Sequence, residues 1–166
     1  MIVMETSKGI IKIELWQEQA PATVENFVNY VKSGYYAGTI FHRVIPDFMI
    51  QGGGFDAKVQ PKPAGKPIRN EASAERPNRR GTIAMARTSN PHSATSQFFI
   101  NVKDNRFLDK DQAEDGWGYA AFGKVVEGMD VVDKISRLAS GQSGPHGNVP
   151  IEPVVITAVR VDETPA

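Results

Sequence analysis

Arg43 and Gln51 are two of the polar side chains in the mostly apolar stretch that runs from residue 39 to residue 51. If this stretch forms strands, alternation places Arg43 on the same face as Phe41 and Ile45. An arginine among apolar neighbours either extends its charged head to solvent at the rim of a core or belongs to a functional site. The pattern alone leaves both interpretations open, and Gln51 raises the same question.

A second segment combines a strand of small residues with two adjacent aromatic rings. Residues 82–86 read Thr-Ile-Ala-Met-Ala, and residues 97–102 contain Phe98 followed directly by Phe99. Neighbouring side chains on a strand point to opposite faces of the sheet, so one ring joins the core and the other is exposed or lines a pocket. Burial of both rings in a core is the more common outcome, and the pattern does not separate these alternatives.

Other catalytic chemistries find little support in the sequence. The chain has no cysteine, which removes disulfides, thiolate nucleophiles and cysteine-based metal sites. Its histidines, at positions 42, 92 and 146, are far apart and have no carboxylate at metal-ligand spacing, so we expect no metal site and no cofactor. No glycine-rich loop opens a helix, which disfavours nucleotide binding. A hydrolase triad of His42 with Ser93 or Ser96 lacks the spacing of a nucleophile elbow.

The composition is that of a globular protein with balanced charge. The chain has 166 residues, 40% apolar and 23% charged, which suits one domain over residues 1–166. Lys plus Arg and Asp plus Glu each number 19, which disfavours nucleic acid or an anionic membrane as partner. Glu5 and Lys8 interrupt the first apolar run, and no stretch reaches the roughly 18 apolar residues of a membrane helix. We therefore expect a soluble, cytoplasmic protein.

Two segments have the periodicity of amphipathic helices. The first runs from Pro21 to a capping Gly34, with apolar residues at positions 24, 27, 28 and 31. The second runs from about Met129 to Leu138. Each has one apolar face, so each helix is expected to pack on another element.

The remaining apolar runs are short and resemble strands. They span residues 2–6, 10–15, 39–45, 48–51, 82–86, 97–102, 119–126 and 154–161. The break at Gly9 predicts a hairpin between the first two runs. Strands outnumber helices and do not alternate with them, which predicts an antiparallel barrel or sandwich with helices packed on it. Long connections over residues 52–80, 101–118 and 139–153 either decorate the surface or wall a binding groove.

Taken together, these segments resemble the cyclophilins. The matching segments are Phe41–Gly53, Gly81–Ala86, Ser96–Ile100, Ala20–Phe27 and Phe122–Met129. The resemblance extends from about residue 2 to residue 161 and is greatest to the small bacterial cytoplasmic peptidyl-prolyl cis–trans isomerases. It implies a mainly β fold: a closed eight-stranded antiparallel β-barrel capped by two α-helices. It also implies that the protein accelerates rotation about X-Pro peptide bonds in folding or flexible chains.

The same resemblance assigns roles to individual residues. Arg43 resembles the catalytic arginine of the family. Phe48, Met49 and Phe99 look like the pocket that holds the proline ring, with Leu108 at its edge. The other implied substrate-binding residues are Gln51, Ala86, Arg87, Thr88, Gln97, Phe107 and Tyr119.

Three of these positions depart from the best-known eukaryotic pattern. Arg87 stands where those members have asparagine, Phe107 where they have tryptophan, and Tyr119 where they have histidine. The family contact at the first position is made largely through the backbone, so peptide binding is expected to survive. The other two departures predict weak cyclosporin binding with catalysis retained. The segment Gly54–Arg69 also departs, and no role is carried over to it.

Two functions of different classes are compatible with these residues. The first is an isomerase that acts, as a monomer, on proline-containing peptides and on unfolded or flexible protein segments. The second is a proline-peptide binding module or chaperone without significant turnover. Arg43 favours the isomerase, because a mere binder does not need it. A lipocalin-like ligand barrel is disfavoured, because bulky inward side chains would fill its interior.

Overall fold

The computed structural model describes residues 1–162, and these form ten β-strands, two α-helices and one short 3₁₀ helix. The strands are β1 (Ile2–Thr6), β2 (Gly9–Leu15), β3 (Arg43–Ile45), β4 (Met49–Gly52), β5 (Thr82–Met85), β6 (Phe98–Asn101), β7 (Ala121–Glu127), β8 (Ser140–Ser143), β9 (His146–Pro150) and β10 (Ile156–Val161). The helices are α1 (Pro21–Lys32), α2 (Met129–Ser136) and the 3₁₀ helix η1 (Arg106–Leu108).

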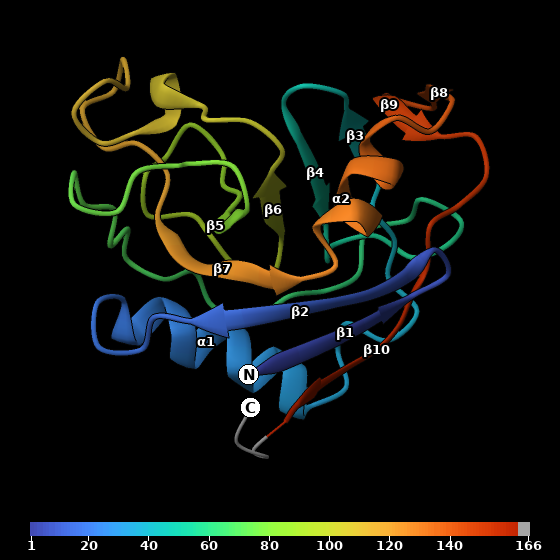
Figure 1. The fold of residues 1–166 in the computed structure, drawn as a ribbon, viewed down its shortest axis with the longest axis horizontal. Coiled ribbons are helices and arrows are strands. Elements are labelled where there is room, and N and C mark those ends of the chain that lie inside the picture. Colours follow the sequence, from blue (N-terminus) through green and yellow to red (C-terminus); the bar gives the residue numbers. More distant parts are fainter. Residues whose placement is uncertain (163–166) are drawn as a thin grey trace.

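Eight of the strands form one curled antiparallel sheet in the order β10-β1-β2-β7-β5-β6-β4-β3 (Figure 1). The prediction of a closed barrel is wrong, because β10 and β3 are the edges and no ladder joins them within residues 1–162. An isolated bridge between Ile40 and Val155, with flanking backbone hydrogen bonds, connects the segments that precede these two strands. The sheet is therefore an open half-barrel.

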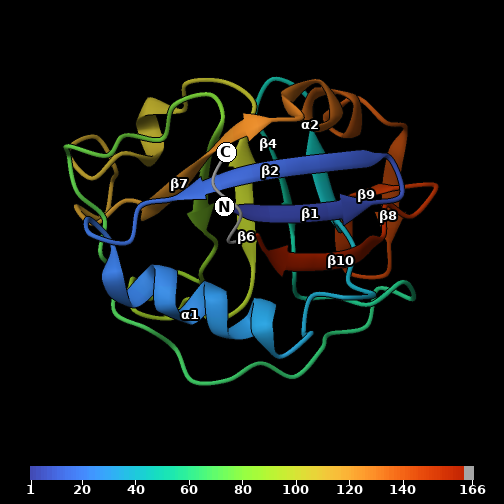
Figure 2. The same ribbon diagram turned by 60° about the horizontal axis from the view of Figure 1, so that its bottom comes forward.

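The two predicted helices are confirmed and lie on opposite sides of the curled sheet (Figures 1 and 2). Helix α1 buries the apolar face predicted from its periodicity, including Val24, Phe27 and Val31. The Phe27 ring packs against Phe98 and Phe122, with ring centroids 5.7 and 5.2 Å away. These rings tie α1 to β6 and β7 and form part of the main core. No helix in residues 1–162 is both long and apolar enough to cross a membrane.

One expectation about side-chain faces is corrected. The predicted strand over residues 39–45 begins as a strand only at Arg43. Residues 41 and 42 leave the strand conformation, which breaks the alternation before β3 begins. As a result Phe41 is fully buried in the core while Arg43 is exposed, so the two do not share a face.

The connection over residues 139–153 is not a plain loop. It contains β8 and β9, which pair with each other as a separate two-stranded antiparallel hairpin. The hairpin lies beside β3 at one edge of the half-barrel (Figure 1). The hairpin predicted at Gly9 is confirmed by the antiparallel pairing of β1 with β2.

Candidate active site

A row of paired residues crosses five strands of the half-barrel. Arg43 of β3 pairs with Gln51 of β4, which pairs in turn with Phe99 of β6. Phe99 pairs with Ala84 of β5, which pairs with Ala121 of β7. Paired residues of an antiparallel sheet project to the same face, so the cation, the amide and the ring stand side by side. The two alanines continue the row with small side chains.

A cavity of about 150 Å³ opens over this row. Its lining residues are Arg43, Phe48, Met49, Gln51, Ala86, Arg87, Phe99, Leu108 and Tyr119. Nine of the twelve site residues suggested by the sequence therefore meet around one cavity. Of the three long connections, only that over residues 101–118 contributes to this lining, through Leu108 of η1.

The adjacent rings of Phe98 and Phe99 separate as their strand positions require. Phe98 is fully buried in the main core against α1. Phe99 lies on the other face, in a smaller apolar cluster with Met49 and Leu108, and lines the cavity. The pocket alternative is therefore correct for Phe99, and the core alternative holds for Phe98.

The polar side of the cavity is a chain of three side chains. The exposed Arg43 donates from Nη1 to Oε1 of Gln51 at 3.4 Å, and its guanidinium lies 6.0 Å from the centre of the Phe48 ring. Gln51 donates from Nε2 to Oε1 of Gln97 at 3.0 Å. Gln97 is not among the lining residues, but it supports one that is. The contact between Arg43 and Gln51 is long and uses only one of the five N–H donors of the guanidinium. It therefore orients the guanidinium and leaves its other donors available.

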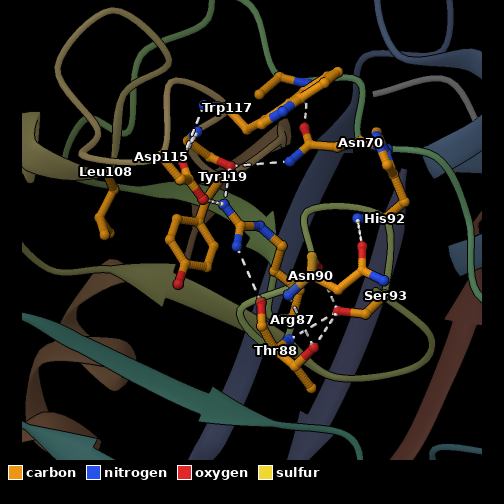
Figure 3. Close-up of polar contacts among 12 residues, drawn as sticks. Asn70, Arg87, Thr88, Asn90, His92, Ser93, Leu108, Asp115, Trp117 and Tyr119 are labelled. Atoms are coloured by element: carbon orange, nitrogen blue, oxygen red, sulfur yellow. Dashed lines mark hydrogen bonds and ion pairs between the residues drawn. The ribbon is translucent and has the colours of Figure 1, made fainter.

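Arg87, another of the lining residues, anchors a second polar cluster (Figure 3). Its guanidinium donates to the Asp115 carboxylate and the Gly118 carbonyl and lies over the Tyr119 ring. The hydrogen bond from the Trp117 amide, together with those from Gly118 and Arg87, lowers the pKa of Asp115 to about 2. Sequence reasoning missed Asp115, although an aspartate that precedes the glycines of a tight turn is a known turn signal.

Two further predicted residues lie beside the cavity without lining it. Thr88 hydrogen-bonds through its amide and hydroxyl to the Ser93 hydroxyl, at 2.9 and 2.8 Å. Phe107 is 60% exposed, and its ring centroid lies 5.6 Å from that of Phe48, which does line the cavity. Thr88 is therefore held by its own loop, and Phe107 forms an outer rim.

The histidines take no part in the cavity lining. His42 is buried, with its ring centroid 4.4 Å from that of Phe55 and 6.2 Å from that of His146. Burial, with smaller contributions from His146 and Arg43, lowers the pKa of His42 to about 4. Within residues 1–162, no three histidine or acidic side chains gather as metal ligands would.

The cavity combines an apolar floor of Met49, Phe99 and Leu108 with the cationic hydrogen-bond donor Arg43 in its lining. Comparison with known proteins identifies the group to which the protein belongs. The family model described as "Cyclophilin type peptidyl-prolyl cis-trans isomerase/CLD" matches residues 1–161. The chain therefore belongs to the cyclophilin family, and it is a peptidyl-prolyl cis–trans isomerase, as the sequence resemblance predicted.

Individual relatives match over nearly their whole length. A peptidyl-prolyl cis–trans isomerase of Acinetobacter baylyi is 56% identical over 161 residues, which cover 97% of this chain and 85% of the relative. Peptidyl-prolyl cis–trans isomerase B of Escherichia coli is 53% identical over 164 residues, covering 98% of this chain and all of the relative. A cyclophilin-type isomerase of Cryptosporidium parvum, crystallised in the presence of the dipeptide Ala-Pro, is similar in structure with a TM-score of 0.81, 28% identity and coverage of 98% and 99%.

Proposed function

We propose that the 150 Å³ cavity holds the proline ring of an X-Pro segment and that Arg43 is the catalytic residue. The observation that carries this proposal is the row in which Arg43 and Gln51 stand directly beside Phe99. The apolar floor of Met49, Phe99 and Leu108 suits a hydrophobic ring. The cation at the rim then lies next to the bond that rotates.

The chemistry of the reaction explains why this site needs only a pocket and a donor. The X-Pro peptide bond has a rotation barrier of about 18–20 kcal/mol because its nitrogen lone pair is shared with the carbonyl. The cis and trans forms differ by only about 0.5–1 kcal/mol, so the reaction is slow but nearly balanced. No bond breaks, and no nucleophile takes part.

Arg43 is suited to lower this barrier. At the twisted midpoint the proline nitrogen becomes pyramidal and regains its lone pair. A cationic donor aimed at that lone pair binds the twisted state more tightly than either planar state, which is the condition for catalysis. Arginine keeps its charge at ordinary pH and presents a rigid set of donors, several of which the single contact to Gln51 leaves free.

The surrounding residues bind the substrate chain in this proposal. Gln51 and Gln97 contact the substrate backbone, and the segment Ala86–Thr88 lies along it as a strand would. Phe107 and Tyr119 form the outer contacts, where the departures from the eukaryotic pattern weaken cyclosporin binding. Exposure of Phe107 at the rim supports its part in this assignment.

The proposed substrates are proline-containing peptides and unfolded or flexible protein segments. We further propose that residues 1–166 form a single isomerase domain that acts as a cytoplasmic monomer and binds neither nucleic acid nor membranes. The family match over residues 1–161 and the balanced charge of the chain support these assignments.

The decisive experiment compares wild type with Arg43→Ala in an isomerisation assay on a short X-Pro peptide, alongside a binding titration. We expect kcat/KM to fall about a hundredfold or more, the scale of losing one preorganised donor, with peptide affinity changed far less. Circular dichroism should stay native because Arg43 is exposed and outside the core. Near wild-type turnover would refute the catalytic role, and unfolding would assign Arg43 a structural one.

A further inference from the structure

Arg87 is an arginine at the cavity whose charged head does not reach solvent. Its side chain is only 4% exposed. Nη2 donates to Oδ2 of Asp115 at 2.7 Å and to the Gly118 carbonyl at 2.8 Å, and Nη1 donates to the Thr88 carbonyl at 3.0 Å. Figure 3 shows the guanidinium directed into the turn that carries Asp115, Trp117 and Tyr119. The side chain is therefore committed to contacts within the protein.

The turn held by Arg87 is closed by hydrogen bonds to Asp115 and joined to the cavity wall. Oδ1 of Asp115 accepts hydrogen bonds from the amides of Trp117 and Gly118 at 2.9 and 3.1 Å. Gly118 has a positive φ of 67°, and a Cβ there would lie 2.7 Å from the Leu108 carbonyl, so turn and wall are in close backbone contact. The amide of the next residue, Tyr119, donates to that same carbonyl at 2.9 Å.

The Tyr119 ring lies between Arg87 and the floor of the cavity. The Arg87 guanidinium carbon is 4.3 Å from the centre of the Tyr119 ring, at cation–π distance. On the cavity side, the same ring meets Phe99 edge to face, with centroids 5.6 Å apart. Arg87 thus contacts the two groups, the Gly118 carbonyl and the Tyr119 ring, that connect the turn to the lining.

No strand holds this wall. In the described chain, the segment between β6, which ends at Asn101, and β7, which begins at Ala121, contains only η1. The sheet ladder therefore does not fix Leu108 and Tyr119 in place. A backbone hydrogen bond joins Tyr119 to Leu108, and the Asn78 side chain donates to the carbonyl oxygens of both. The fork of Arg87 adds contacts to the Gly118 carbonyl and the Tyr119 ring.

We infer that Arg87 is a positioning residue for substrate binding: through Asp115, Gly118 and Tyr119 it holds the wall of the proline pocket at the spacing that binds substrate. This inference rests on the proposed role of the cavity. Lysine cannot replace Arg87, because the three contacts come from two separate nitrogens of a planar guanidinium, whereas lysine donates from a single atom and has no plane to stack on the ring. The departure from asparagine at this position is therefore functional rather than neutral.

The chain contains a matched control pair. Arg80 and Asp133 form an equally close ion pair, with two contacts of 2.7 Å, but neither lines the cavity. Arg80→Lys therefore removes the same kind of fork from an ion pair that is more exposed and does not line the cavity. An effect that Arg80→Lys and Arg87→Lys share therefore reflects the loss of an arginine–aspartate ion pair as such, and not a change at the cavity.

The test measures kcat and KM separately on a short X-Pro peptide, together with the NMR resonances of the Tyr119 ring, one of four tyrosines in the chain. For Arg87→Lys we expect KM to rise about fivefold with kcat within about twofold, the signature of lost uniform binding. Asp115→Asn should raise KM about two- to threefold. The double variant should be no worse than Arg87→Lys within about twofold, since both changes act through one turn. The Tyr119 resonances should shift in these variants and stay fixed in Arg80→Lys.

Three results would overturn the inference. An unchanged KM in Arg87→Lys would show that the wall does not need the fork. A fall in kcat at constant KM would make Arg87 a transition-state contact, and an equal rise in KM for Arg80→Lys would make the effect nonspecific. If Arg87→Lys does not fold, Asp115→Asn decides by the same KM and resonance criteria. Arg43→Ala in the same assay tests the proposed catalytic role separately, because it predicts a large fall in kcat/KM with peptide affinity changed far less, whereas Arg87→Lys predicts a rise in KM with kcat nearly unchanged.

Discussion

Gln51 donates from its side-chain nitrogen to the side-chain oxygen of Gln97 at 3.0 Å, and this contact decides which end of the Gln51 amide faces Arg43. With the nitrogen engaged, the Gln51 oxygen is free to accept from Arg43 Nη1. A reversed amide would present N–H groups to a cation that has only donors. Gln97 therefore influences the guanidinium of Arg43 without touching it.

Gly54 gives Gln97 the space to hold this position, and Gly54→Ala should lower activity. A Cβ at residue 54 would lie 2.4 Å from Cγ and 2.7 Å from Cδ of Gln97, so the glutamine must move. We expect kcat/KM to fall about three- to tenfold through misorientation of Gln51 and Arg43. The matched control is Gly141→Ala, because nothing lies within 4 Å of a Cβ there. Full activity in Gly54→Ala would disconnect Gln97 from catalysis.

Phe107→Trp should tighten cyclosporin binding and leave peptide turnover nearly unchanged. Phe107 is an exposed rim residue next to Phe48 and has no hydrogen-bond donor. Tryptophan adds an indole N–H and apolar area, and one hydrogen bond of about 0.5–1.5 kcal/mol plus that area gives about tenfold or more in affinity. Inhibition titrations of both forms in the isomerase assay measure this, with kcat/KM expected within a few-fold. Equal inhibition would assign drug affinity to Tyr119, Arg87 or the Gly54–Arg69 segment.

Catalysis should be nearly independent of pH between about 6 and 9 and insensitive to a chelator, because no proposed role uses an acid–base pair or a metal ligand. The ionisable groups near the site with lowered pKa values lie outside this window, with Asp115 at about 2 and His42 at about 4. The measurement is kcat/KM against pH, with and without EDTA. A steep limb inside the window, or loss of activity with EDTA, would contradict the mechanism.

Stability, in contrast to turnover, should depend on pH through His42. Its folded-state pKa of about 4 lies below the ordinary value of 6.5, so the unfolded chain takes up a proton first as pH falls. The contribution of neutral His42 to the free energy of unfolding is fully present above pH 6.5. It is lost as pH falls toward 4, by at most about 1.4 kcal/mol per pH unit. Wild type should therefore lose about 2 kcal/mol from this residue between pH 7 and 5.

The variant His42→Phe isolates this contribution. It removes the titrating imidazole ring. One of the nitrogens of that ring, Nδ1, is buried and has no hydrogen-bond partner in the described structure. Urea unfolding at pH 7 and pH 5 should show a smaller loss of unfolding free energy in the variant than in wild type. His92→Gln, at an exposed position, should lose as much as wild type. Parallel losses in all three proteins would refute the assignment to His42.

The parts of the fold that sequence predicted well are those set by local patterns. The spacing of Val24, Phe27 and Val31 marks an apolar helix face whatever the helix packs on, and α1 buries those residues. Closure of the sheet depends instead on how two distant edges meet, and no local pattern encodes that. The β8–β9 hairpin was missed because its Gly, Ser and Pro residues lack apolar alternation and look like a loop.

In the site, too, features set by local patterns could be predicted and features set by distant contacts could not. Arg43, Gln51 and Phe99 could be named from the sequence, and strand pairing brings them together as a row, while their roles stay predictions for the experiments above. The burial of Arg87 could not be anticipated, because its partner Asp115 is 28 residues away in a loop without periodicity. The sequence presents this residue only as an arginine where an asparagine was expected.

The pairing of β1 with β10 has a consequence for synthesis on the ribosome. Ile2 lies opposite Val161, 159 positions later in the chain, so β1 has β2 on one side early but lacks its other neighbour until β10 is made. During translation the row that carries Arg43 and Phe99 can therefore assemble while one edge of β1 is still unpaired, because β10 has not yet been made. The isomerase is itself a nascent chain in which the edge strand β10 is made after the other described strands.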